Sequence, residues 1–133
     1  MKKTMNGVKP LSIDLGLLLL RIAAGGLMLI NHGWPKIMNF ADKADRFADP
    51  FGIGSTPSLI LVIFAEFFCS SLLVLGLLTR YSLIPLIITM VVAAFVVHAG
   101  DPFREIESAL FFLISYVALF FTGPGKYSAD HIR

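Results

Sequence analysis

The sequence predicts an all-α integral membrane protein, built as an antiparallel four-helix bundle. Of its 133 residues, 56% are hydrophobic and only 15% are charged, and the mean hydropathy is +0.80. Soluble domains average about 25% charged residues, and a chain this small has too little interior to hide so many apolar side chains. The composition excludes a disordered chain and a nucleic-acid-binding protein. The length leaves room for a single membrane domain over residues 1–133.

The first apolar run predicts a membrane span over residues 11–30. Its twenty residues match the roughly 20 needed to cross the hydrocarbon of a bilayer. The lysines that precede it resemble the start of a signal peptide, which is the alternative interpretation. However, the run contains Asp14 and Arg21, and no small-residue cleavage pattern follows it. We therefore expect a retained helix.

Three further apolar runs predict spans over residues 58–78, 82–97 and 106–122. Pro57 precedes the second span, where proline favours a helix start, and Pro85 falls in the first turn of the third, where proline is tolerated. Residues 123–125 (Gly-Pro-Gly) form a strong stop signal after the fourth span. Only three residues separate the second and third spans, so these two helices must form a tight antiparallel pair.

The first loop, residues 31–56, is long enough to hold a short helix at the membrane interface. Phe40 and Phe47 are seven residues apart and lie on one helical face, with charged residues between them. The alternative is a plain loop with scattered phenylalanines.

The distribution of lysine and arginine predicts that both termini are cytoplasmic in a bacterial-type inner membrane. Six of these residues lie in the N-terminal tail, the second loop and the C-terminal tail, against four in the first and third loops. Cytoplasmic segments carry the excess of positive charge.

Charged residues within the spans predict a functional interior. Asp14, Arg21 and His32 are spaced by 7 and 11 residues, which places them on one stripe of the first helix. An arginine at the centre of a membrane helix costs about 2.5–3.5 kcal/mol, so it needs a partner. Arg21 and Glu66 lie near the middle of adjacent spans, and we expect an ion pair between them. Two roles stay open: the pair fixes helix register, or it also faces a substrate or proton path.

A second polar group is expected where the first and third spans end and the fourth begins. Its members are His32, Lys36, His98, Asp101, Glu105 and Glu107. Histidines and carboxylates at one level favour a hydrogen-bonded cap or a proton relay. A metal site is disfavoured because no tight ligand spacing is present, and a haem between His32 and His98 is disfavoured by their position at helix ends. The single cysteine, Cys69, excludes dithiol chemistry within one chain.

Two aromatic residues complete the candidate site. Trp34 follows the first span and is expected either to anchor the helix at the interface or to line a pocket mouth. Tyr116 lies deep in the fourth span, where its hydroxyl needs a partner, and Glu66 and Arg21 are the candidates.

Four segments together resemble the DoxX family of small four-helix membrane proteins. They are LLLRIAAGGLMLINHGWPKI (18–37), DPFGIG (49–54), FAEFFCSSLLVLGLLTR (64–80) and GPGKYSAD (123–130). The resemblance implies a membrane component of a redox or stress-response complex, since the family name derives from a membrane subunit of thiosulfate:quinone oxidoreductase. Recurring polar positions of the family fall on Arg21, His32, Lys36, Glu66 and Arg80, without assigned roles.

Three functions follow as hypotheses. The first is a quinone-handling subunit in which Glu66 and His32 move protons, Arg21 stabilises a quinol anion, and Trp34, Lys36, His98 and Tyr116 bind the quinone. No covalent cofactor is expected, and the sequence holds no electron carrier of its own, so the electrons would come from a partner redox protein or subunit, or from a soluble reductant. The second is a non-catalytic scaffold for another protein, with the loop from Phe40 to Phe51 as its docking surface. The third is a transporter formed by a homo-oligomer, although the two halves show no repeat symmetry.

Overall fold

The computed structural model describes residues 7–132 and confirms an all-α fold with four helices that are long and apolar enough to span a membrane. The four helices cover Ile13–Met38, Ser55–Leu75, Thr79–Val97 and Phe103–Thr122. Lys2, Lys3 and Arg133, which contribute to the expected charge bias, lie outside the described residues.

The first helix continues well past the expected end at Ile30. It consists of α2 (Ile13–Met28), the π-helical segment η1 (Leu29–Gly33) and α3 (Trp34–Met38). The Ser12 side chain caps its start by accepting a hydrogen bond from the Leu15 N–H at 3.2 Å. Pro35 does not stop the helix: it lies two residues after the π-helical segment η1, and the chain stays helical through it to Met38.

The other helices are also assembled from shorter segments. The second contains α5 (Ser55–Ile63), η2 (Phe64–Cys69) and α6 (Ser70–Leu75), the third contains α7 (Thr79–Val92) and η3 (Ala93–Val97), and the fourth is α8 (Phe103–Thr122). Two short helices, α4 (Phe40–Lys43) and α9 (Ala129–Ile132), lie outside the spans.

The long first loop contains a shorter helix than the phenylalanine spacing suggests. Between Met38, where the first helix ends, and Ser55, where the second begins, only α4 is helical, and the chain then turns back through Asp49 to the start of α5. Phe40 and Phe47 therefore do not share one helix.

Three of the four helices widen into a π turn. The segments η1, η2 and η3 interrupt the first, second and third helices respectively. A π turn adds a residue to the helical turn and redirects the side chains around it, and such turns often occur at functional sites. The amino-acid pattern does not predict them.

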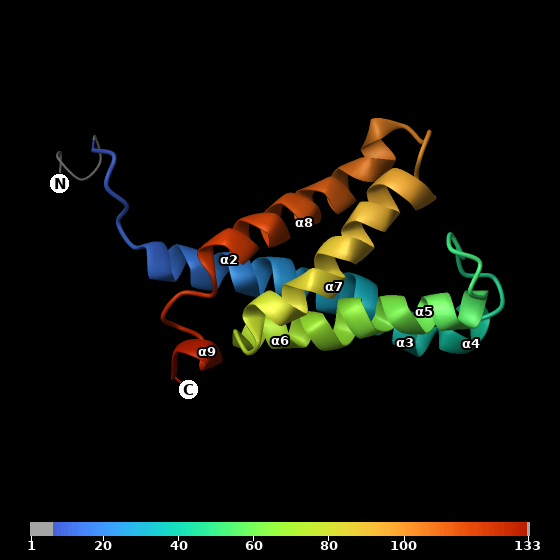
Figure 1. Ribbon diagram of the computed structural model, residues 1–133, viewed down its shortest axis with the longest axis horizontal. Coiled ribbons are helices and arrows are strands. Elements are labelled where there is room, and N and C mark those ends of the chain that lie inside the picture. The colour runs from blue at the N-terminus through green and yellow to red at the C-terminus, as the bar shows by residue number, and fades with distance from the viewer. Residues whose placement is uncertain (1–6, 133) are drawn as a thin grey trace.

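The helices form two antiparallel hairpins that diverge toward one end. The first hairpin joins α2 to α6 and η1 to η2, and the second joins α7 to α8. Figure 1 shows α7 and α8 leaning away from the first hairpin as they approach the turn between them. We call this the pocket end, and the opposite end, where α2 begins and α8 stops, the tail end.

The buried core is small and lies where the hairpins meet. Met28, Leu73, Leu83, Leu86 and Leu119 are almost fully buried there. Many other large apolar side chains face outward along the four helices, as expected for side chains that contact lipid.

Candidate functional site

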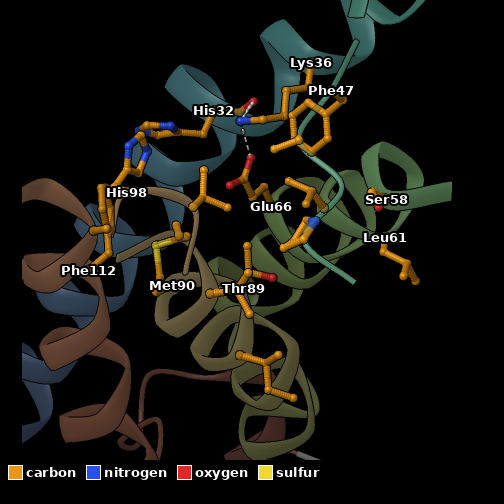
Figure 2. Close-up of a pocket in the computed structure, with 18 of the residues that line it drawn as sticks. His32, Lys36, Phe47, Ser58, Leu61, Glu66, Thr89, Met90, His98 and Phe112 are labelled. Carbon is orange, nitrogen blue, oxygen red and sulfur yellow. Dashed lines mark hydrogen bonds and ion pairs between the residues drawn. The ribbon is translucent and has the colours of Figure 1, made fainter. Parts of the chain in front are cut away.

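A pocket of about 380 Å³ lies between the two hairpins at the pocket end (Figure 2). Its wall is mostly apolar, with Met28, Met90 and Phe112 among the lining side chains. A few polar side chains converge on it. This is the usual composition of a small-molecule site, and the volume falls within the usual range of about 300–1,000 Å³.

The central polar feature of the pocket is an ion pair between Lys36 and Glu66. Lys36 Nζ lies 2.7 Å from Glu66 Oε1, and the two side chains are 16% and 6% exposed. Lys36 Nζ also donates a hydrogen bond to the His32 carbonyl at 3.4 Å. A charge at this depth is stabilised mainly by its partner.

Gly33 makes this ion pair geometrically feasible. A Cβ atom at this position would clash with the backbone carbonyl of Glu66, so only glycine lets the first and second helices approach so closely. Lys36 is one turn further along the same helix. The close approach therefore places its ammonium against the carboxylate of Glu66.

The expected ion pair between Arg21 and Glu66 is wrong. The Arg21 guanidinium is 1% exposed, but it lies at the tail end, where its Nη2 donates to the Tyr127 carbonyl at 2.7 Å. The estimate of equal depth assumed a first helix that ended at Ile30. Because that helix runs to Met38, its residues near Gly33, rather than Arg21, are level with Glu66.

Arg21 belongs to a polar cluster formed with the C-terminal segment. The Asp130 carboxylate interacts electrostatically with Arg21 and accepts hydrogen bonds from the Leu78 N–H, the Thr79 N–H and the Thr79 hydroxyl at 2.7–2.9 Å. Asp14 accepts a hydrogen bond from the Lys126 N–H at 3.0 Å. These contacts hold the C-terminal segment against the turn between the second and third helices.

Most of the expected polar group at the pocket end is brought together. His32, Lys36, His98 and Glu105 line the pocket, and Figure 2 shows the rings of His32 and His98 directed toward each other at one edge of it. His98 Nδ1 lies 3.0 Å from Asp101 Oδ2. Glu107 instead faces a smaller surface depression with Arg104. Within residues 7–132, no three histidine, cysteine or acidic side chains are grouped closely enough to hold a metal ion.

The two aromatic candidates do not reach the pocket wall. Trp34 packs against Phe67, with ring centroids 6.1 Å apart. Tyr116 is fully buried, and its hydroxyl donates to the Ala24 carbonyl at 3.1 Å rather than to Glu66 or Arg21. Its ring stacks on Phe112, which does line the pocket. Tyr116 thus supports the wall from behind.

Several pocket residues are not apparent from the sequence alone. Ser58 and Thr89 contribute hydroxyl groups, and Phe47 covers the pocket from the first loop. Phe112 packs edge-on against the His32 ring, with centroids 5.7 Å apart. Its spacing of four residues from both Ser108 and Tyr116 is a signal that could have placed it on the interior stripe of α8.

The DoxX family model matches residues 16–99, which is more than half of the chain. The chain belongs to the DoxX family. The matched range contains most of the first helix and all of the second and third, with the ion pair of Lys36 and Glu66. The C-terminal segment that contacts Arg21 follows the matched range. No curated protein and no solved structure matches this DoxX chain.

Proposed function

We propose that this DoxX protein is the quinone-binding membrane subunit of an oxidoreductase system. The observation that supports the proposal is the buried ion pair of Lys36 and Glu66 at the wall of an apolar pocket between membrane helices. A quinone ring is flat and apolar with two carbonyl oxygens. It needs an apolar cavity and a hydrogen-bond donor, and Lys36 supplies the donor.

Reduction of a quinone to a quinol consumes two electrons and two protons. The electrons come from a redox subunit that docks with this chain, and the protons come from the side chains of the pocket. Lys36 stabilises the negative charge that develops on the ring oxygen, which is the role that the sequence suggested for Arg21. Glu66 and His32 line the same pocket. In this proposal each takes up a proton delivered from the surface and passes it to that oxygen, since the Glu66 carboxylate has no proton of its own while it is paired with Lys36.

Protons reach the pocket through its polar corner. His98 lines the pocket, and its side chain is 41% exposed, while its partner Asp101 is 47% exposed. Glu105 lines the same corner and is exposed. These groups connect the surface with the interior, and histidine can both accept and release a proton near neutral pH.

The experiment is a titration of the purified protein with a short-tailed benzoquinone, followed by fluorescence. The single tryptophan, Trp34, lies next to Gly33 and packs on Phe67, so a quinone bound nearby should quench it. We expect Glu66→Gln to weaken binding about tenfold, because a charged partner of a hydrogen bond is worth about 1.5–3 kcal/mol.

Glu107→Gln is the matched control, since it makes the same chemical change at an exposed position outside the pocket. Equal affinity of the unaltered protein and both variants would overturn the assignment of Glu66. A loss of affinity in both variants would show that the effect is not specific to the pocket.

The proposal includes an orientation in the cell membrane. Because lysine and arginine are more numerous in the two tails and the second loop, the proposal places both termini in the cytoplasm. The pocket end then lies near the outer surface of the membrane. In a Cys69→Ser background, a membrane-impermeant maleimide should label Asp45→Cys in intact cells and should not label His131→Cys. The reverse pattern contradicts the orientation.

A further inference from the structure

The pocket extends to the flank of the protein between α5 and α7. Leu61 on α5 and Ile88 on α7 both line the pocket, yet they are 59% and 57% exposed. A side chain that borders a cavity and is also open to the surroundings marks an opening of that cavity. Figure 2 shows Leu61 projecting at the pocket's edge. Both residues lie within spans, so the opening faces lipid rather than water.

The helices separate here because of how the hairpins pack. The third helix contacts the second mainly through α6 and η2, and α7 packs most extensively on α8. Toward its end the third helix follows α8 away from α5 (Figure 1). Apolar side chains on both edges line the resulting gap.

At the loop end, part of the first loop lies over the pocket without sealing it, because Phe51 and Ile53 are themselves 67% and 49% exposed. Phe47, Pro50, Phe51 and Ile53 line the pocket from this side. Asp49 fixes this cover to the start of α5: its carboxylate accepts hydrogen bonds from the Ile53 N–H at 3.0 Å, the Gly54 N–H at 2.8 Å and the Ser58 hydroxyl at 3.0 Å.

We infer that the ligand of this pocket enters sideways from the bilayer between α5 and α7, and that it carries a hydrocarbon tail which stays in that opening. The inference rests on the proposed function and specifies its substrate class: a membrane-resident quinone with a prenyl or alkyl tail. The head lies at Lys36 and Glu66, and the tail passes between Leu61 and Ile88 to the lipid. A tail left in the hydrocarbon avoids the cost of transferring its apolar surface to water.

The test compares two quinones and a pair of variants in lipid nanodiscs. Ile88→Trp narrows the opening, and Ile84→Trp is its control, since Ile84 lies one turn earlier on α7, is exposed, and does not line the pocket. Binding of decylubiquinone and of its tailless ring analogue is measured by calorimetry. Each quinone partitions into the nanodisc lipid to the same extent for every variant, so this contribution cancels when the affinities of two variants for one quinone are compared.

We expect Ile88→Trp to weaken binding of decylubiquinone about tenfold relative to Ile84→Trp, and to leave the tailless ring within twofold. Equal losses for both quinones, or no loss for either, overturn the lateral opening. Failure of the unaltered protein to bind either quinone overturns the proposed function itself, so the two failures are distinguishable.

A second pair keeps the test valid if Ile88→Trp does not fold. Leu61→Trp narrows the same opening from α5, and Ile60→Trp places the same ring on a neighbouring exposed position that does not line the pocket. The expected pattern is the same. Equal decylubiquinone affinities for these two variants contradict the inference.

Discussion

The tail end and the pocket end both contain charges buried within membrane helices, but they satisfy them differently. At the tail end, the chain itself supplies the partners: Arg21 donates to the Tyr127 carbonyl, and Asp130 binds Thr79. At the pocket end, Lys36 and Glu66 pair with each other at the edge of a cavity. A buried charge alone therefore does not identify a functional site. The distinguishing feature is whether the charge borders open volume.

The backbone differs in the same way. At the tail end, Gly76 and Leu78 adopt a left-handed conformation, with φ of 70° and 50°, to form the tight turn that Asp130 caps. At the pocket end, three helices widen into π turns beside the cavity. The tight turn keeps the second and third helices close together at the tail end. The π turns lie where the helices are further apart, beside the cavity at the pocket end. If this comparison is correct, substitutions at the tail end should change stability, and those at the pocket end should change binding.

The largest loss of stability is expected for Arg21→Met. Arg21 is 1% exposed, and its replacement removes the hydrogen bond to the Tyr127 carbonyl and the positive charge that interacts with Asp130; loss of a buried charged contact costs about 3 kcal/mol or more. Unfolding of the purified protein, followed by circular dichroism, measures this loss. Quinone affinity, measured where the variant is still folded, should be unchanged. A stable variant that no longer binds quinone would place Arg21 in the site and invalidate the comparison.

Gly33→Ala should lower both the stability of the protein and its affinity for quinone. Its Cβ would meet the Glu66 backbone, and overpacking of this kind costs about 1–3 kcal/mol while it separates Lys36 from Glu66. Gly26→Ala is the matched control, since a Cβ there has no neighbour within 4 Å. The control should gain stability slightly, by about 0.5–1 kcal/mol, and bind quinone normally. Thermal unfolding and the fluorescence titration decide the outcome, and identical behaviour of the two variants would contradict it.

Lys36→Met should change stability by only about 1 kcal/mol, because Glu66 borders an open pocket and is not enclosed by packed side chains on every side. Quinone affinity should fall about tenfold in the same titration. The double variant Lys36→Met/Glu66→Leu should recover the stability, since an apolar pair replaces a buried ion pair at little cost, and should not recover binding. Recovery of quinone binding in the double variant would show that the ion pair has only a structural role.

The smallest effect is expected for Asp49→Asn, and it should depend on pH. Burial raises the pKa of Asp49, but hydrogen bonds from the Gly54 N–H, the Ser58 hydroxyl and other N–H groups outweigh this effect, so the pKa lies below its ordinary value of 3.8. A lowered pKa in the folded state stabilises the fold above the unfolded pKa, and the stabilisation is lost as pH falls through the folded value.

The thermal midpoint of the unaltered protein should therefore approach that of Asp49→Asn below about pH 4 and exceed it at neutral pH. Asp45→Asn is the control, because Asp45 is exposed and its carboxylate makes no such contacts in the described part of the loop. A constant difference between the two proteins across this pH range would contradict the role of Asp49.

The sequence predicts the existence of the four helices because each contains a continuous apolar run, although the first helix extends past its expected end at Ile30 to Met38. It also predicts that His32, Lys36, His98 and Glu105 meet at one end of the bundle. In an antiparallel bundle, the first and third helices end on the side where the fourth begins. Both predictions depend on local pattern and topology. Neither requires knowledge of how far each helix extends.

The partner of Glu66 could not be predicted in this way. The choice between Arg21 and Lys36 depends on the register of two helices, which Gly33 fixes by close backbone contact. The π turns likewise arise from packing between helices and leave no periodic signal in the sequence. The C-terminal contacts of Arg21 join residues 106 positions apart, a separation that local patterns cannot resolve.

That separation has a consequence for how the protein is made. Tyr127, which accepts the hydrogen bond from Arg21, is synthesised only after all four spans. At about 5–20 residues per second, translation takes roughly 5–20 s to cover the 106 residues between them. During this interval the first helix must stay in the membrane with its arginine unmatched. A segment that is made after all four spans thus completes the assembly of the first of them, and a nascent protein that stalls before this segment exposes an unpaired charge to membrane quality control.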